Sequence, residues 1–167
     1  MRRNIELKAR LSDPSAAQAI AAQLCNGQFE TQRQTDTYFH CPSGRLKLRE
    51  INGREAQLVW YQRPDQSAAK GSDYLLVPVA EPALLHAALS GALGVRGVVR
   101  KTRRVYLYQN VRIHLDEVEG LGSFLEFEAV LDDGMSDEAG HAQLAQLRRE
   151  FGLSETDLLA GSYGDML

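Results

Sequence analysis

The segment 124–131, FLEFEAVL, places Glu126 and Glu128 two positions apart. Because successive side chains of a β-strand point to opposite faces, both carboxylates share one face. The other face is apolar and consists of Leu125, Phe127, Ala129 and Leu131. The segment 4–11 repeats the arrangement, with charged or polar residues on one side: Asn4, Glu6, Lys8 and Arg10. Both segments predict strands of a sheet that carries charge along one face.

Further segments have the alternation or the β-branched and aromatic content of strands. We expect two strands within 29–51, joined by a turn at 41–44, and further strands at 55–63, 72–79, 95–108 and 111–118. Several of these strands are joined by short turns that contain Gly, Pro or Asn, at 41–44, at Asn52-Gly53 and at Asn110, as in hairpins. Strands joined by short turns pair antiparallel, so the pattern predicts a meandering antiparallel sheet.

Three segments have the apolar spacing and the start signals of helices. Asp13 and Pro14 open the first, which runs to about Cys25, and Pro82 opens the second over 83–93. Ser136 caps the third, which carries apolar residues at core-facing spacing. We expect these helices to cover the apolar face of the sheet, which gives an α+β fold class.

Alternation assigns many ionisable or polar residues to the face opposite the helices. They are Asn4, Glu6, Lys8, Arg10, Arg45, Lys47, Arg49, Lys101, Arg103, Arg112, His114, Asp116, Glu126 and Glu128. Burying isolated ions in a dry core costs many kcal/mol. We therefore expect this face to be solvated.

The charges of this face are grouped by sign. The cations are Lys47, Arg49, Lys101 and Arg103, and the anions are Glu6, Asp116, Glu126 and Glu128. A single pair of charges is more often part of a solvated outer surface than of a site. The grouped set indicates instead a site for an anion and a metal ion, because Lys and Arg hold phosphates and carboxylates hold Mg²⁺ or Mn²⁺.

Bulk composition limits the classes of protein to which this chain could belong. With 167 residues and 44% hydrophobic content, the chain can form one domain over 1–167. A net charge of −3 and a pI near 5.8 argue against a general nucleic-acid or membrane binder. The N-terminus lacks the apolar core of a signal peptide, so we expect a soluble cytoplasmic protein. Cys25 and Cys41 lack zinc-site spacing and do not support a redox role.

Short charged segments follow one another in a characteristic order. They are ELK at 6–8, GRLKLR at 44–49, KTR at 101–103, LDEV at 115–118, GLG at 120–122 and EFE at 126–128. No single segment is specific, but the ordered set spans nearly the whole chain and resembles the CYTH domain. That family is also called the triphosphate tunnel metalloenzymes, and includes class IV adenylate cyclases, thiamine triphosphatases and inorganic triphosphatases. The resemblance implies an eight-stranded antiparallel β-barrel whose lumen binds a triphosphate and Mg²⁺ or Mn²⁺.

The same resemblance implies roles for individual residues. The metal ligands and catalytic residues would be Glu6, Glu126 and Glu128, with Asp116 supporting the metal or its water. The phosphate-gripping residues would be Lys8, Lys47, Arg49, Lys101, Arg103 and, with a weaker match, Arg112. Arg10 and Arg45 fit a place on the tunnel wall or rim at least as well as they fit a role in gripping phosphate. His114 is either a general base or a hydrogen-bonded wall residue, and Tyr163 either closes one end of the tunnel or packs there.

One position departs from the family signature Glu-x-Glu-x-Lys. Asn4 stands where the first Glu belongs. An amide keeps an oxygen acceptor and loses a charge, so a second metal ion would be held more weakly.

The leading hypothesis is hydrolysis of the terminal phosphate of a triphosphate compound. The alternatives are cyclisation of ATP to cyclic AMP, binding of a polyphosphate or phosphometabolite without catalysis, and a purely structural domain. The sequence leaves open the physiological substrate, the metal preference and the oligomeric state, a homodimer included.

Overall fold

The computed structural model describes residues 1–132 and 134–167. The strands are β1 (Arg2–Arg10), β2 (Glu30–Phe39), β3 (Arg45–Ile51), β4 (Glu55–Gln62), β5 (Lys70–Pro78), β6 (Val95–Tyr108), β7 (Val111–Val118) and β8 (Gly122–Val130). The helices are α1 (Pro14–Leu24), α2 (Pro82–Leu93), α3 (Asp137–Glu150) and two short 3₁₀ helices, η1 (Glu155–Asp157) and η2 (Tyr163–Met166).

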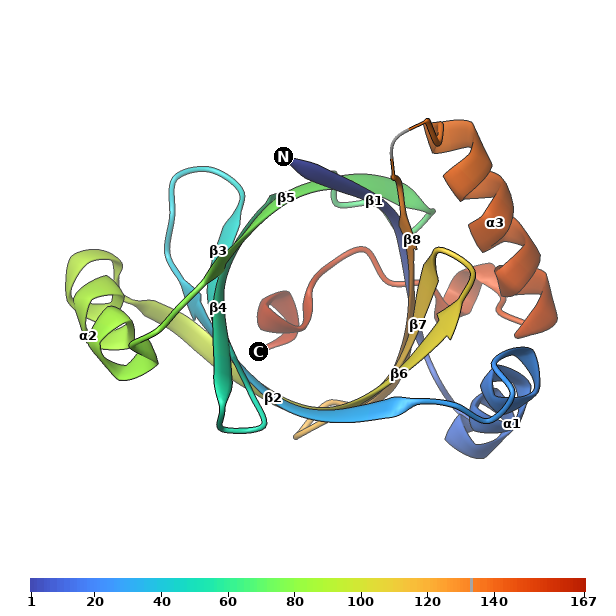
Figure 1. Cartoon of the computed structure of the whole chain (residues 1–167), viewed down its shortest axis with the longest axis horizontal. Coiled ribbons are helices and arrows are strands. Elements are labelled where there is room, and N and C mark those ends of the chain that lie inside the picture. Colours follow the sequence, from blue (N-terminus) through green and yellow to red (C-terminus); the bar gives the residue numbers. More distant parts are fainter. Residues whose placement is uncertain (133) are drawn as a thin grey trace.

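The eight strands form a closed barrel in the order β1-β5-β4-β3-β2-β6-β7-β8, with every neighbouring pair antiparallel. Figure 1 shows this ring from its end. The ring closes between β1 and β8, the first and last strands of the chain. The eight-stranded antiparallel barrel with three covering α-helices is confirmed.

The main apolar core lies outside the barrel wall. Side chains of β1, β7 and β8, including the fully buried Ile5, Ile113 and Phe127, pack against α1 and α3. A smaller cluster around Phe39 and Leu48 lies under α2, on the opposite side of the ring. Among the described residues, no helix is long and apolar enough to cross a membrane.

Local signals set the ends of α1 and α3 as the sequence predicts. The carboxylate of Asp13 accepts a hydrogen bond from the backbone N–H of Ala16 at 3.1 Å. The hydroxyl of Ser136 accepts one from the N–H of Ala139, also at 3.1 Å. Each bond satisfies a backbone donor that the first helical turn leaves free.

The C-terminal segment enters the barrel and closes one end (Figure 1). The ring of Tyr163 packs with four wall residues at that end: Tyr38, Val99, Val118 and Phe124. Asp165 anchors the segment through ion pairs of 2.8 Å to Arg45 and 2.7 Å to Arg96. The C-terminal segment therefore fills this end of the barrel.

Candidate functional site

The apolar faces of the strands point outward, so the alternate positions line the lumen. The lumen contains a cavity of about 260 Å³. Nine predicted site residues line it: Glu6, Lys8, Lys47, Arg49, Lys101, Arg103, Arg112, Glu126 and Glu128. The tenth, Asp116, is only 2% exposed and is not part of the cavity lining.

The charged face is less solvated than we expected. Lys8, Lys101 and Arg103 are at most 8% exposed, and Asp36 is fully buried. Closing the sheet into a barrel brings opposite charges from different strands together, and these pairs offset the cost of removing each ion from water. The expectation of a solvated face was wrong for these residues because it treated the charges as unpaired.

Asp36 of β2 lies at the centre of a group of three cations, and we call these four residues the Asp36 cluster. Its Oδ2 atom accepts from Lys47 Nζ at 3.1 Å, Lys101 Nζ at 2.9 Å and Arg49 Nη2 at 2.7 Å. Arg49 Nε donates to Oδ1 at 2.8 Å. The cluster joins β2, β3 and β6 across the wall of the lumen.

The Asp36 cluster carries more positive than negative charge. Burial alone would raise the pKa of Asp36, but Arg49, Lys101 and Lys47 hold it well below its usual range. Burial lowers the pKa of Lys101 well below its usual value, although Asp36 opposes this effect. With all groups ionised, three cations face one carboxylate, which leaves an excess of two positive charges. Such a group favours binding of a further anion.

Asp116 forms a second buried ion pair. Arg103 donates to both of its oxygens, at 2.8 and 2.7 Å, and the Tyr163 hydroxyl donates to Oδ2 at 2.6 Å. Burial alone would raise the pKa of Asp116, but Arg103 lowers it to about 2. Asp116 therefore orients Arg103 and anchors Tyr163, and both of its oxygens are engaged.

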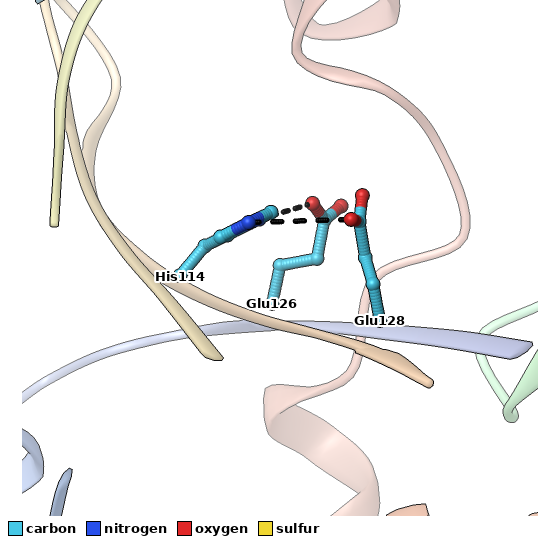
Figure 2. A group of neighbouring side chains, drawn as sticks. All are labelled: His114, Glu126 and Glu128. Carbon is cyan, nitrogen blue, oxygen red and sulfur yellow. Dashed lines mark hydrogen bonds and ion pairs between the residues drawn. The ribbon is translucent and has the colours of Figure 1, made fainter. Parts of the chain in front are cut away.

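His114, Glu126 and Glu128 form the acidic side of the lumen. Figure 2 shows their side chains converging from β7 and β8. His114 Nδ1 lies 3.1 Å from Glu126 Oε1, and its Nε2 lies 4.0 Å from Glu128 Oε2. One ligand atom from each of the three residues lies within 4.8 Å of the others. Carboxylate oxygen and imidazole nitrogen are donors that a divalent metal ion accepts.

Cations also approach these carboxylates. Lys8 Nζ lies 3.6 Å from Glu126 Oε2, and Arg103 Nη2 lies 3.6 Å from Glu126 Oε1. Arg112 Nε donates to Glu128 Oε2 at 2.9 Å. The cations that were predicted to bind phosphate and the carboxylates that were predicted to bind a metal ion therefore line the same cavity.

Glu6 lies beside Glu128 in the β1–β8 register. Burial, together with the charges of Glu126 and Glu128, raises the pKa of Glu6 to about 7. Its carboxylate pairs with Arg63 Nε at 3.0 Å. Arg63 directly follows the end of β4 and was not among the residues that the sequence analysis assigned to the charged face.

Asn4, the departure from the family signature, is 4% exposed and lines the same cavity. The Tyr74 hydroxyl donates to its Oδ1 atom at 3.2 Å. The amide thus accepts a hydrogen bond from a neutral group where the signature has a carboxylate.

Arg10 and Arg45 lie away from the central charges. The Arg10 guanidinium lies over the ring of Phe124 and donates to the Leu121 carbonyl at 3.1 Å. Arg45 pairs with Asp65 and with Asp165 of the C-terminal segment, at 2.8 Å each. Their contacts place both at the end of the barrel that Tyr163 closes.

Asp36 is the main residue that the sequence analysis missed. The segment 30–39 contains few apolar residues, so its alternation is weak. The available signal was its hairpin partner, because Asp36 pairs directly with Arg49 in the β2–β3 register. Extending the parity of Lys47 and Arg49 across that hairpin would have placed Asp36 in the lumen.

Comparison with known proteins agrees with this geometry. Residues 2–163 match the CYTH domain. The adenylate cyclase CyaB of Aeromonas hydrophila is 28% identical over 169 residues, covering 95% of this chain and 85% of that protein. The PH1012 protein of Pyrococcus horikoshii OT3 has a similar structure, with a TM-score of 0.80, 26% identity, and 98% and 99% of the two chains covered.

A conserved hypothetical protein of Pyrococcus furiosus has the same fold, with a TM-score of 0.82, 19% identity, and 98% and 99% of the two chains covered. The family match extends over all eight strands and over the lumen that they enclose. The chain therefore belongs to the CYTH family of triphosphate tunnel proteins.

Proposed function

We propose that this protein is a divalent-metal-dependent enzyme that hydrolyses the terminal phosphate of a triphosphate compound. The observation that carries the proposal is the placement of two complementary groups in one lumen. The Asp36 cluster offers excess positive charge, and His114, Glu126 and Glu128 converge next to it. Strand β6 connects the two groups because it pairs with β2 on one side and β7 on the other.

The cations would bind and orient the phosphate chain. Arg49 presents a planar fork of donors, and Lys47 and Lys101 add two ammonium groups. Lys8 and Arg103 extend the positive surface toward Glu126. Charge-assisted hydrogen bonds of this kind hold phosphate oxygens and offset the charge that develops during phosphoryl transfer.

The acidic side has the donor set for Mg²⁺ or Mn²⁺. Glu126, Glu128 and His114 would hold the ion, and Glu6 is a further candidate ligand beside Glu128. An imidazole in the set suits Mn²⁺ better than Mg²⁺, which prefers oxygen ligands. When bound, such an ion neutralises phosphate charge and activates water for attack. Asp116 would act indirectly, by fixing the guanidinium of Arg103.

A second candidate reaction is the cyclisation of ATP to cyclic AMP and pyrophosphate. It is favoured by the Aeromonas hydrophila relative, whose name is adenylate cyclase CyaB. In this reaction the ribose 3′-hydroxyl replaces water as the nucleophile, while the same cations bind the phosphates.

A third candidate is a protein that binds polyphosphate or a phosphometabolite without turnover. It is favoured by Asn4, which removes one negative charge from the acidic side.

Analysis of the reaction products distinguishes the three candidate functions. The protein is incubated with inorganic triphosphate, thiamine triphosphate or ATP, in Mg²⁺ or Mn²⁺. Release of orthophosphate is the expected result. Cyclic AMP with pyrophosphate would indicate the second reaction, and binding without products would indicate the third function.

Glu126→Gln should lower turnover at least about 100-fold, since it removes a charge that would hold the metal ion. Glu117→Gln is the matched control, because the side chain of Glu117 is exposed. Absence of both binding and turnover with all three compounds would contradict every one of these functions.

A further inference from the structure

Arg63 places a fixed positive charge beside the carboxylate that β1 contributes to the lumen. Its side chain is 3% exposed and lines the same cavity as Glu6. Its Nε atom lies 3.0 Å from Glu6 Oε1, and its Nη1 group donates to the Ala160 carbonyl at 2.8 Å. One contact joins Arg63 to β1, and the other joins it to the segment that leads into η2. The guanidinium is therefore held in place from two sides.

Asn4 makes the same side of the lumen a poor site for a metal ion. It lies two positions before Glu6 on β1, so both side chains take the same face of the strand. Its Oδ1 atom already accepts a hydrogen bond from the Tyr74 hydroxyl at 3.2 Å. The Nδ2 group of the same amide is a donor and cannot coordinate a cation. Where the family signature has two neighbouring carboxylates, this chain has one, and Arg63 pairs with one of its oxygens.

The side formed by β7 and β8 is different. His114, Glu126 and Glu128 converge there, with one ligand atom of each within 4.8 Å of the others (Figure 2). In the part of the chain that the structure describes, this is the one group of three metal-binding side chains that comes together so closely. A second divalent ion in the lumen would depend on β1 for its ligands, and it would also meet the like charge of Arg63.

The gathered carboxylates need positive charge even without a metal ion, because buried anions are costly unless they are paired. Lys8 and Arg103 each lie 3.6 Å from an oxygen of Glu126. Arg63 supplies the corresponding charge at Glu6. A second metal ion on this side would supply the same charge, so the guanidinium already meets that electrostatic need.

We propose that Arg63 takes the place of a second divalent ion, and that the lumen holds one Mn²⁺ or Mg²⁺ per chain. A guanidinium neutralises charge but cannot bind and activate water as a metal ion does. Water activation is therefore left to the side of Glu126 and Glu128. This inference rests on the proposed function and specifies how many metal ions that function uses.

Counting bound Mn²⁺ ions tests the inference. The protein is titrated with Mn²⁺, and the free ion is followed by electron paramagnetic resonance. The wild type should bind one ion per chain. Asn4→Glu should also bind one, because Arg63 still pairs with Glu6. Asn4→Glu combined with Arg63→Met should bind two, because the second carboxylate is restored and the competing cation is removed.

Matched variants separate the charge of Arg63 from other effects. Arg54 is exposed in the turn between β3 and β4, so Asn4→Glu with Arg54→Met should bind one ion. Asn4→Glu with Arg63→Lys keeps the positive charge and should also bind one. If Arg63→Met prevents folding, Arg63→Gln replaces it, since the amide can still donate to the Ala160 carbonyl.

Three results would overturn the inference: two ions in the wild type, two ions in Asn4→Glu alone, or one ion in Asn4→Glu with the Arg63 charge removed. The outcome also separates this inference from the function on which it rests. Release of orthophosphate by a wild type that binds two ions contradicts the inference alone. Absence of Mn²⁺ binding contradicts the proposed metal-dependent function, and the inference with it.

Discussion

Asp36 shows how one residue determines the arrangement of several others. Its side chain is fully buried, and its two oxygens accept hydrogen bonds from Lys47, Arg49 and Lys101. Without this carboxylate the three cations would repel one another in a poorly hydrated space. In the free protein Asp36 thus stands in for part of the charge that a bound phosphate would supply.

Replacing Asp36 tests this compensation. Asp36→Asn should lower the free energy of unfolding by about 3 kcal/mol, the usual scale for breaking a buried ion pair. Saturating triphosphate should raise the melting temperature more in this variant than in the wild type, because the ligand restores the missing negative charge. Thermal melts with and without triphosphate measure both effects.

Asp73→Asn is the matched control, since Asp73 pairs with Arg3 and its side chain is 45% exposed. It should change stability little and leave the ligand-induced shift unaltered. Equal ligand-induced shifts in Asp36→Asn and wild type would contradict the compensating role.

At the scale of secondary-structure elements, the position of α3 depends on a glycine. A Cβ atom on Gly140 would lie 2.7 Å from Ile5 Cγ1 and 3.0 Å from Leu131 Cδ2. The helix therefore approaches β1 too closely for a larger residue. Ile5 directly precedes Glu6 on β1, so the contact with α3 lies on the strand that carries the lumen residues Glu6 and Lys8.

Two glycine-to-alanine substitutions separate packing from helix propensity. Gly140→Ala should destabilise the protein by about 1–3 kcal/mol, because the new methyl group overpacks the α3–β1 contact. Gly91→Ala in α2 should stabilise it by up to about 1 kcal/mol, since a Cβ there meets no atom within 4 Å. Urea denaturation of both variants measures the two effects. Stabilisation by Gly140→Ala would show that α3 can move away from β1 at little cost.

At the scale of the whole molecule, assembly of the barrel brings distant parts of the chain together in ion pairs and hydrogen bonds. Asp36 and Lys101 are 65 residues apart, and Asp116 and Tyr163 are 47 residues apart. These contacts form only once β2, β6, β7 and the C-terminal segment have all assembled. Their charges should therefore be linked to global unfolding.

The acid stability of the fold tests this linkage. Three neighbouring cations hold the pKa of Asp36 well below its usual range, and Arg103 lowers that of Asp116 to about 2. In the unfolded chain both should titrate near the ordinary Asp pKa of about 3.9. As pH falls below about 4, the unfolded state takes up protons first, so stability present at higher pH is progressively lost.

The free energy of unfolding, measured in urea from pH 6 to pH 3, should decline more steeply in the wild type than in Asp36→Asn. The variant lacks one of the carboxylates whose pKa is lowered in the folded protein, and so loses part of the pH dependence. Identical slopes would show that Asp36 does not titrate with a lowered pKa in the folded protein.

Much of this architecture could be predicted from local patterns. The period-two alternation correctly assigned Lys47, Lys101 and Glu126 to the lumen, because side-chain direction along a strand depends on parity alone. Helix starts at Asp13 and Ser136 were predicted because a cap acts within three residues. The ordered charged segments were enough to indicate the family.

Partner choice could not be predicted in the same way. Asp116 was expected to support a metal ion or its water, which stays a prediction, and its contacts with Arg103 and Tyr163 were not foreseen. Glu6 pairs with Arg63, and Asp36 received no role from the sequence. Alternation states which face a side chain takes, but it does not state which residue lies opposite.

The sequence by itself thus determined the strands, the helix caps, the two faces of the sheet and the grouping of charges by sign. The tertiary structure alone decided which charges pair and which end of the lumen the C-terminal segment closes. The physical reason is that these features depend on the register of non-consecutive strands. The pairings β1–β5, β2–β6 and β1–β8 join segments far apart in the chain, and their stagger sets which side chains meet inside the barrel.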